Sequence, residues 1–282
     1  MRWFIFLSFF VAVILGLFVW GSGTDVRRAA EEGLQQVRDV LPAPTTRFLV
    51  IGDNHGVNPI YRAALARAKK ENVDFVLNLA DLTEHGTQEE FAAVDELERS
   101  YGVPVYHTLG SHDLKTDGTG ALYTERFQPR WYSKDIGTVH LVVLDNANRK
   151  IGFPKEELDW LDKDLTANTK DITILAFHRP FGFPLADLLG DDETPTSRRS
   201  NDAFRVILAK HPVARIYAAH LHTHATYSLD GVPVEISGGG GDPAQTILGG
   251  PDHNFFHAIL VTAREKEITS EVIPLAATAN PS

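Results

Sequence analysis

The feature that most constrains this chain is a series of short apolar runs, most of which end in Asp or His. Such runs of about four to eight residues, bounded by polar turns, are typical of buried strands. Amphipathic segments with helical spacing separate several of them. The predicted strands are residues 47–52, 73–80, 103–109, 138–145, 172–178, 214–219, 233–238, 256–263 and 268–273. The predicted helices are residues 58–70, 88–100, 155–168 and 200–210.

This order of elements predicts one α/β domain over residues 47–275. Helices dominate the connections in the first half, whereas later strands follow one another directly. That mixture favours a sheet sandwich covered by helices. Residues 184–199 and the run Gly238–Gly241 are expected to be mobile loops, because they are rich in glycine, proline and polar residues.

The first 22 residues have a different composition from the rest. An unbroken apolar run extends from Trp3 to Trp20, and as a helix it would be about 27 Å long, close to the hydrocarbon thickness of a bilayer. Its length and its large flanking side chains favour an uncleaved membrane anchor over a cleaved signal peptide. Residues 23–46 are expected to form a juxtamembrane linker. We expect the domain to lie outside the cytoplasm, membrane-anchored or, if the segment is cleaved, secreted or periplasmic.

Charge and cysteine content narrow the function. The formal net charge is −10, which argues against nucleic-acid binding, because that requires clustered Lys and Arg. An acidic chain can still bind phosphate where metal cations reverse the local field. With no cysteine in the chain, the strong metal ligands available to it are His and carboxylates.

Candidate ligands follow five predicted strands, at the edge where open α/β sheets bind their ligands. Asp81 has a second interpretation, a carboxylate that caps a turn. The alternating His220, His222 and His224 are more specific, because in an extended segment they would share one face. Together these donors suit two divalent cations such as zinc, iron or manganese. The candidates are Asp53, His55, Asp81, Ser111, His112, Asp113, His178, His220 and His222.

In order and spacing, these segments resemble the calcineurin-like metallophosphoesterase superfamily, whose pattern is Asp-x-His, Gly-Asp, Gly-Asn-His-Asp/Glu, His and Gly-His-x-His. The resemblance covers residues 47 to about 265. It implies a four-layered α/β/β/α sandwich, two divalent metal ions and a phosphate-ester substrate. It also implies hydrolysis of a mono- or diester by a hydroxide held between the two metals.

The resemblance also implies a role for each candidate. Asp53, His55 and His222 would bind one metal, His178 and His220 the other, and Asp81 would bridge them. His112 would stand beside the leaving-group oxygen as a proton donor or positive stabiliser. Asp113 would orient the His112 ring.

The chain departs from the family pattern at several positions. Ser111 stands where the family has an Asn that ligates the second metal, and a serine hydroxyl is shorter and a poorer ligand. The alternative function is therefore a weakened or inactive member that only binds metal or phosphate. Ala80 and Ala219 replace family glycines. Glu84 stands where purple acid phosphatases have an iron-binding Tyr, which argues against that subgroup. Arg179 could contact phosphate or pair with an acid at the surface, and both interpretations remain open.

Overall fold

The computed structural model describes residues 27–28, 31, 43–184, 193–242 and 255–276. The chain divides into two compact units, Met1–Pro44 and Thr45–Ser282, and all the described strands belong to the second. The predicted membrane anchor lies outside the described residues. Within the ranges given above, no helix is long and apolar enough to cross a membrane.

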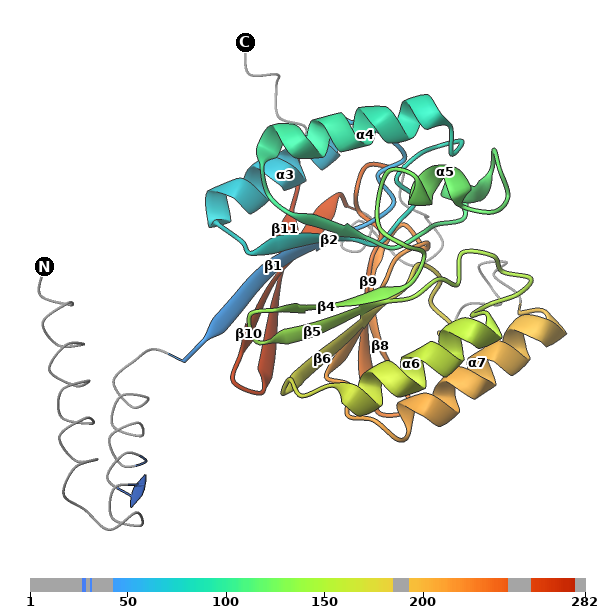
Figure 1. The fold of residues 1–282 in the computed structure, drawn as a ribbon. Helices are drawn as coiled ribbons and strands as arrows, with labels where there is room; N and C mark the ends of the chain where they lie inside the picture. Colours follow the sequence, from blue (N-terminus) through green and yellow to red (C-terminus); the bar gives the residue numbers. More distant parts are fainter. Residues whose placement is uncertain (1–26, 29–30, 32–42, 185–192, 243–254, 277–282) are drawn as a thin grey trace, which may run out of the picture. The chain divides into compact units, whose positions relative to one another are not determined.

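Two sheets form the centre of the second unit (Figure 1). In the first, β1 and β2 pair in parallel, β2 and β3 pair in parallel, and β10 and β11 extend the sheet in the antiparallel sense. Its strand order is β11 (Glu267–Pro274), β10 (His257–Arg264), β1 (Thr45–Ile51), β2 (Phe75–Asn78) and β3 (Val105–His107).

The second sheet has a parallel centre, β5-β6-β7-β9, and an antiparallel strand at each edge. Its strand order is β4 (Tyr132–Ile136), β5 (Val139–Val143), β6 (Ile172–Ala176), β7 (Arg215–Ala218), β9 (Val232–Ser237) and β8 (His224–Leu229).

Strand alternation divides the core into layers. In β1, Phe48 and Val50 belong to an apolar cluster made by strands of both sheets, whereas Leu49 and Ile51 belong to a cluster with α3 (Pro59–Glu71) and α4 (Gln88–Tyr101). Helices α6 (Lys155–Ala167) and α7 (Pro195–Leu208) cover the outer face of the second sheet. Figure 1 shows the two helical layers on opposite sides. The predicted four-layered α/β/β/α sandwich is therefore confirmed.

Local signals explain where the long helices begin. The Asn58 side chain accepts hydrogen bonds from the backbone N–H groups of Ile60 and Tyr61 at the start of α3. Thr87 and Glu90 form a capping box at the start of α4. Such side chains replace the hydrogen-bond partners that the first turn of a helix lacks.

Several predicted boundaries are wrong. Strands β4 and β8 were not predicted, because their sequences mix polar and apolar residues on half-exposed sheet edges. Helix α7 begins at Pro195, within the predicted loop 184–199, because Thr194 and Ser197 form a second capping box. Two short elements, η1 (His112–Leu114) and α5 (Ala121–Thr124), were also missed.

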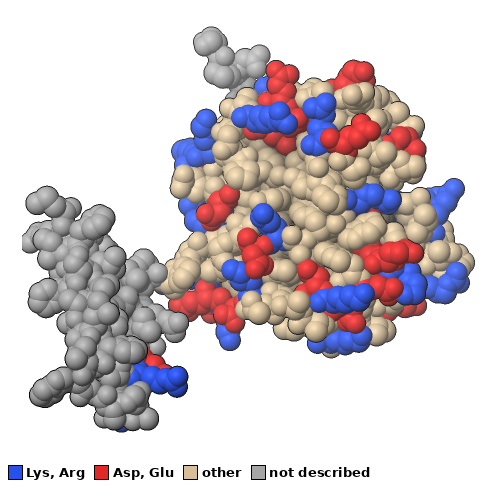
Figure 2. All heavy atoms as spheres, in the orientation of Figure 1, with Lys and Arg blue, Asp and Glu red and all other residues tan. Residues whose placement is uncertain are grey.

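Charged side chains of both signs share the surface. On the face drawn in Figure 2, Lys and Arg are interspersed with Asp and Glu and do not form one continuous basic surface.

Candidate metal centre

The candidate ligands lie in loops that follow strands of both sheets. Asp53 and His55 follow β1, and Asp81 follows β2. The other sheet contributes His178 after β6, and His220 and His222 after β7. Since these strands are parallel within each sheet, their carboxyl ends bring the loops to one edge of the sandwich.

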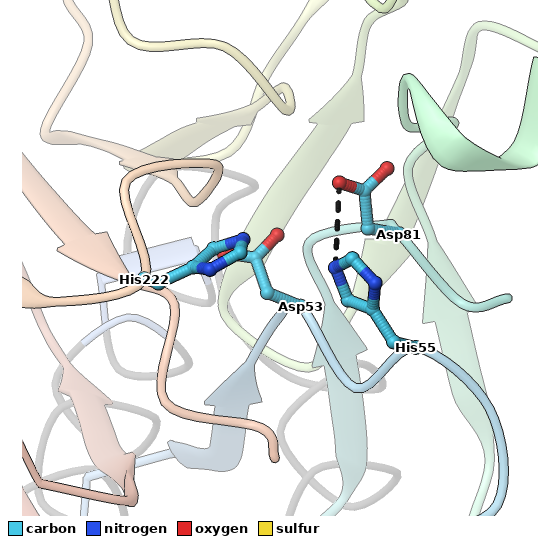
Figure 3. Close-up of side chains that lie close together, drawn as sticks. All are labelled: Asp53, His55, Asp81 and His222. Atoms are coloured by element: carbon cyan, nitrogen blue, oxygen red, sulfur yellow. Dashed lines mark ion pairs between the residues drawn. The ribbon is translucent and has the colours of Figure 1, made fainter. Parts of the chain in front are cut away.

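The structure gathers these side chains into two overlapping groups. In the first group, Asp53, His55, Asp81 and His222 each offer a ligand atom, and these atoms all lie within 4.8 Å of one another (Figure 3). Asp81, His178 and His220 form the second group by the same measure. Asp81 belongs to both. A third group by the same measure is His55, Glu84 and His112.

The backbone that presents these ligands is not extended. Positive φ angles occur at Asp53 (58°), His55 (46°), Asp81 (46°), His220 (69°) and His222 (43°). The sequence argument that alternating residues share one face of an extended segment is therefore wrong, although the side chains do meet. The left-handed region costs a non-glycine residue about 1 kcal/mol or more, so neighbouring loops must hold it in place.

Backbone hydrogen bonds supply that support. Asp53 N donates to Ala80 O (3.0 Å), and His55 N donates to Asp81 O (2.8 Å). Ala80 itself has φ 79°, a conformation that glycine adopts without strain. The family pattern has glycine at this position, where it avoids backbone strain. Alanine adopts the same conformation with some strain.

The run Gly238–Gly241 packs against the same loops. Its first three residues are buried, and Gly240 N donates to Gly52 O (2.8 Å). A Cβ atom at Gly238 would lie 2.4 Å from Asp53 Oδ2. The prediction of a mobile loop is wrong for Gly238–Gly240, because the glycines allow close packing beside the site.

The two carboxylates of the centre have opposite electrostatic environments. Burial raises the pKa of Asp53 well above its ordinary value, and the charge of His178 only partly opposes this. Burial would also raise the pKa of Asp81, but the charge and the hydrogen bond of His178 lower it well below its ordinary value. Asp81 Oδ2 lies 3.2 Å from His178 Nε2. Asp81 is therefore ionised in the protein, whereas ionised Asp53 needs a further positive partner.

Three histidine rings are oriented by hydrogen bonds from their second nitrogen. His178 Nδ1 lies 3.1 Å from Leu79 O, a carbonyl that can only accept, so Nε2 points toward Asp81. His55 Nδ1 lies 2.7 Å from Glu84 Oε2. His222 Nδ1 lies 2.9 Å from Asp242 Oδ2. Such partners fix the ring orientation and increase the basicity of a metal-binding nitrogen.

Glu84 and Asp242 were missed as functional residues in the sequence. The sequence signal that could have identified them is that both lie close along the chain to stronger candidates. Glu84 is three residues after Asp81, and Asp242 directly follows the glycine run. Neither spacing identifies which histidine each carboxylate meets, because both contacts join segments far apart in the chain.

His112 lies at the edge of the first group. Its ring centroid is 4.2 Å from that of His55, and its backbone N–H donates to Asp81 Oδ1 (2.8 Å). Burial lowers the pKa of His112 below its ordinary value. The side chain is half-buried, and it is therefore accessible to a molecule bound at the centre.

Asp113 has a different role from the predicted one. Its carboxylate accepts hydrogen bonds from Leu82 N (3.3 Å), Thr83 N (3.0 Å), Thr83 Oγ1 (2.8 Å) and Gly110 N (3.1 Å). Burial raises its pKa to about 6. The structure gives it no hydrogen bond to the His112 ring, whose Nδ1 instead lies 2.8 Å from Lys115 Nζ. Asp113 therefore joins the loops after β2 and β3. The expectation that it orients the His112 ring is wrong.

Two other candidates occupy distinct positions. Ser111 precedes η1, and its side chain makes no capping hydrogen bond to that helix. His224 begins β8, and its Nε2 lies 3.3 Å from Glu235 Oε1. It is not a member of the two ligand groups. The alternating histidines therefore separate into two metal candidates and one residue of the sheet edge.

The donor set fits divalent metal ions. Asp53 is fully buried, and within the described part of the chain neither of its carboxylate oxygens, nor His55 Nε2, has a hydrogen-bond partner. An unpaired buried charge is costly, because burial removes the water that would solvate it. A cation between these atoms would satisfy all three, and the mixture of carboxylate and imidazole donors suits zinc, iron or manganese.

Comparison with known proteins agrees with this geometry. The calcineurin-like phosphoesterase family model matches residues 46–224. A protein named "Probable cyclic nucleotide phosphodiesterase" from Rhodococcus erythropolis is 27% identical over 173 residues, which cover 58% of this chain and 56% of the relative. Tartrate-resistant acid phosphatase type 5 of Mus musculus is 23% identical over 186 residues, which cover 49% and 57%. The chain thus spans little more than half the length of these curated relatives.

Solved structures share the fold. A purple acid phosphatase from yellow lupin (Lupinus luteus) seeds has a TM-score of 0.66 and 16% identity, over 83% of this chain and 52% of that one. GAP50, the anchor in the inner membrane complex of Plasmodium, has a TM-score of 0.63 and 15% identity, over 84% and 90%. At these identities the likeness shows the architecture alone.

Proposed function

Because the chain belongs to the calcineurin-like phosphoesterase family, we propose that it is a phosphoric ester hydrolase with a dinuclear metal centre. One observation supports this most strongly. Asp53 is a buried carboxylate without a hydrogen-bond partner, and it lies in a group of four potential ligands that shares Asp81 with a second group of three. Two cations would neutralise both groups.

Each side chain has a specific place in this proposal. Asp53, His55 and His222 would hold one metal, His178 and His220 would hold the other, and Asp81 would be shared between them. Two divalent ions in such a site supply Lewis acidity, activate a water and neutralise the leaving oxygen. Glu84 and Asp242 keep the His55 and His222 rings directed at the metal.

His112 is the proposed acid. It lies next to His55, and its backbone is tied to Asp81. From there it can donate a proton to the oxygen of the departing alcohol. Asp113 maintains this arrangement indirectly, because it fixes the loop that carries His112.

The experiment uses the full chain, stripped of metal with a chelator and supplied with Mn²⁺, Zn²⁺ or Fe²⁺. The substrates are an aryl phosphate monoester and the corresponding bis-aryl diester, because the two curated relatives are named for different ester classes. We expect turnover that requires added metal. The Asp81→Asn variant should lose activity by about a thousandfold, since a charge-stabilising group of the reaction is removed. Turnover that survives metal removal, or Asp81→Asn, contradicts the proposal.

Ser111 supports a second candidate, a member of the family that binds metal or phosphate without turnover. Its hydroxyl stands where the family pattern has an Asn ligand. A Ser111→Asn variant separates the two functions. If Ser111 has weakened the second metal site, the variant gains metal affinity and activity together. A folded wild-type protein that shows no turnover with any of the three metals favours the binding function.

A further inference from the structure

The third ligand group, His55, Glu84 and His112, already contains a positively charged side chain. Lys115 Nζ lies 3.0 Å from Glu84 Oε1 and 2.8 Å from His112 Nδ1. The other carboxylate oxygen of Glu84 lies 2.7 Å from His55 Nδ1. The ammonium group thus makes the contacts that a cation would make with Glu84 and His112. This group of residues therefore has a role other than metal binding.

The local structure places the Lys115 side chain beside the His112 ring. His112 begins the short 3-10 helix η1, and Lys115 N donates to His112 O (3.1 Å) at its end. Side chains three residues apart eclipse one another in such a helix, so these two project from the same side. Glu84 then holds the ammonium group, and His55 holds Glu84. Together these contacts fix a lysine whose side chain is 41% exposed.

The contact with Lys115 determines which nitrogen of His112 carries the ring proton. An ammonium group can only donate, so His112 Nδ1 accepts from Lys115 and the ring proton lies on Nε2. Nδ1 also lies 3.2 Å from Glu84 O, a carbonyl that can only accept and that favours the opposite tautomer. The contact with Lys115 is shorter, and a hydrogen bond from a charged donor is stronger than a neutral one. Lys115 therefore decides the tautomer.

His112 Nε2 is the nitrogen that remains for a bound molecule. Among the described residues, both hydrogen bonds of the ring use Nδ1. The neighbouring carboxylate of Asp113 does not compete for the ring, because it accepts from Thr83 and Gly110. The ring can therefore present an Nε2–H donor to an oxygen at the centre.

We propose that Lys115 is the positioning residue of His112, which keeps the ring proton on Nε2 and replaces it at Nδ1 when Nε2 gives it up. The inference rests on the proposed function for the reaction that it serves. As the ester P–O bond breaks, its electron pair stays on the leaving oxygen, which takes the Nε2 proton. One proton of Lys115 moves to Nδ1, so the ring carries one proton before and after. The reverse shift at Nδ1 and one proton from water restore the starting state.

The first test observes the tautomer without turnover. NMR of the metal-free full chain with nitrogen-labelled histidine, at mildly alkaline pH, identifies the protonated ring nitrogen of His112, and a His112→Gln variant assigns its signals. We expect the proton on Nε2 in the wild type. In Lys115→Met it should move to Nδ1, because Glu84 O is then the remaining partner. A protonated Nδ1 in the wild type, or a protonated Nε2 in Lys115→Met, overturns the proposal.

The second test uses the leaving group. The metal-loaded proteins hydrolyse para-nitrophenyl and benzyl esters of the class that the wild type prefers; the first alcohol departs as a stable anion, and the second needs a proton. The ratio of kcat/KM for the benzyl ester to that for the nitrophenyl ester should fall about tenfold in Lys115→Met, the effect of losing a hydrogen bond from a charged group. Impaired metal binding would slow both esters equally. An unchanged ratio overturns the proposal.

Lys163→Met is the matched control for both tests. Lys163 is an exposed lysine of α6, and its replacement removes the same charge. The tautomer of His112 and the ratio of the two esters should match the wild type. An equal change in Lys163→Met would assign the effect to net charge and overturn the role of Lys115.

A double-mutant cycle tests whether Lys115 acts through His112. In the His112→Gln background, Lys115→Met should change kcat/KM for the benzyl ester by less than about twofold, because the ring on which it acts is absent. An undiminished loss in that background would show that Lys115 acts elsewhere, and it overturns the proposal.

The two proposals can fail separately. If no ester is hydrolysed with any metal but the tautomer of His112 follows Lys115, the hydrolase function is wrong and the contact between the two side chains stands. If both esters are hydrolysed but the tautomer and the ratio ignore Lys115, the hydrolase function stands and the role of Lys115 is wrong.

Discussion

The metal centre and a buried polar network use neighbouring residues of the same segments. The polar network consists of Asn54, Tyr61, Asn78, Glu98 and His107. Asn78 Nδ2 donates to Asn54 Oδ1 and Tyr61 OH (3.0 Å each), Tyr61 OH donates to Glu98 Oε1 (2.5 Å), and Glu98 Oε1 lies 2.9 Å from His107 Nε2. In this network the side chains satisfy one another, apart from Asn78 Oδ1.

Asp53 differs from its neighbour Asn54 in this respect. Both side chains are buried, but neither Asp53 oxygen has a hydrogen-bond partner, whereas the Asn54 amide has three. Buried polar groups that are satisfied stabilise a fold, and those left unsatisfied destabilise it until a ligand arrives. Burial alone therefore does not separate structural residues from ligand-binding ones. Asp53 stands apart because, among the described residues, it is the one with two unsatisfied side-chain oxygens.

The largest expected effect is on the polar network. Glu98→Gln should lower the free energy of unfolding by about 3 kcal/mol, because it leaves the buried His107 without its charged partner. Urea denaturation of metal-free protein measures this. Glu96→Gln, an exposed site on the same helix, is the control and should change stability by less than about 0.5 kcal/mol. Equal effects at both positions would remove the distinction between the regions.

A substitution in the metal centre should change the free energy of unfolding in the opposite direction. The raised pKa of Asp53 means that its ionised form destabilises the metal-free fold, increasingly as the pH rises above the ordinary value of 3.8. Asp53→Asn should therefore raise the free energy of unfolding at pH 7 by about 2 kcal/mol without metal. It should also remove the stabilisation that added Zn²⁺ or Mn²⁺ gives the wild type. The exposed Asp171→Asn serves as the control. A loss of stability in metal-free Asp53→Asn would contradict this account.

Glu84 is the hydrogen-bond partner of His55, one of the proposed metal ligands. Glu84→Gln should weaken metal binding by about tenfold, because His55 loses the carboxylate that orients its ring. Competition with a chelator gives the dissociation constant. Glu89→Gln is the matched control, since Glu89 is an exposed acid nearby in the chain. Unchanged affinity in Glu84→Gln would show that His55 needs no such support.

The smallest effect is the pH dependence of the polar network. Burial would lower the pKa of His107, but the charge of Glu98 raises it above the ordinary value of 6.5. The His107–Glu98 pair therefore contributes fully below pH 6.5, and its contribution is lost as the pH rises through the folded pKa. Between these values stability should fall by at most about 1.4 kcal/mol per pH unit. The slope should diminish in Glu98→Gln. If the slope is unchanged in Glu98→Gln, the pH dependence does not come from the His107–Glu98 pair.

Sequence patterns predicted most of the fold and the residue types of the site. Buried strands such as β1, which ends in Phe-Leu-Val-Ile, and β6, Ile-Thr-Ile-Leu-Ala, are mainly apolar, so their positions were predicted closely. Edge strands β4 and β8 were missed, because half-exposed segments lack that signal. The predicted ligand positions come together in space, but through left-handed loops rather than extended ones.

Contacts between distant segments were not predictable in the same way. In the sequence, nothing connects Glu84 with His55 or Asp242 with His222, because each pair joins distant segments. The glycines Gly238–Gly240 indicated a mobile loop by composition, whereas their lack of side chains allows them to pack against Asp53 and Gly52. Each of these roles depends on which distant segment packs against the residue, and the composition of a segment does not contain that information.

By itself, the sequence determined which donors follow which strands, because the end of a strand and the residue after it are local features of the chain. The tertiary structure decided which atoms meet. The loop after β1 and the loop after β7 belong to different sheets, and only packing of the two sheets brings Asp53 close to His222. The same packing excludes water from Asp53 and leaves its carboxylate without a hydrogen-bond partner among the described residues. It thereby turns an ordinary side chain into a candidate metal ligand.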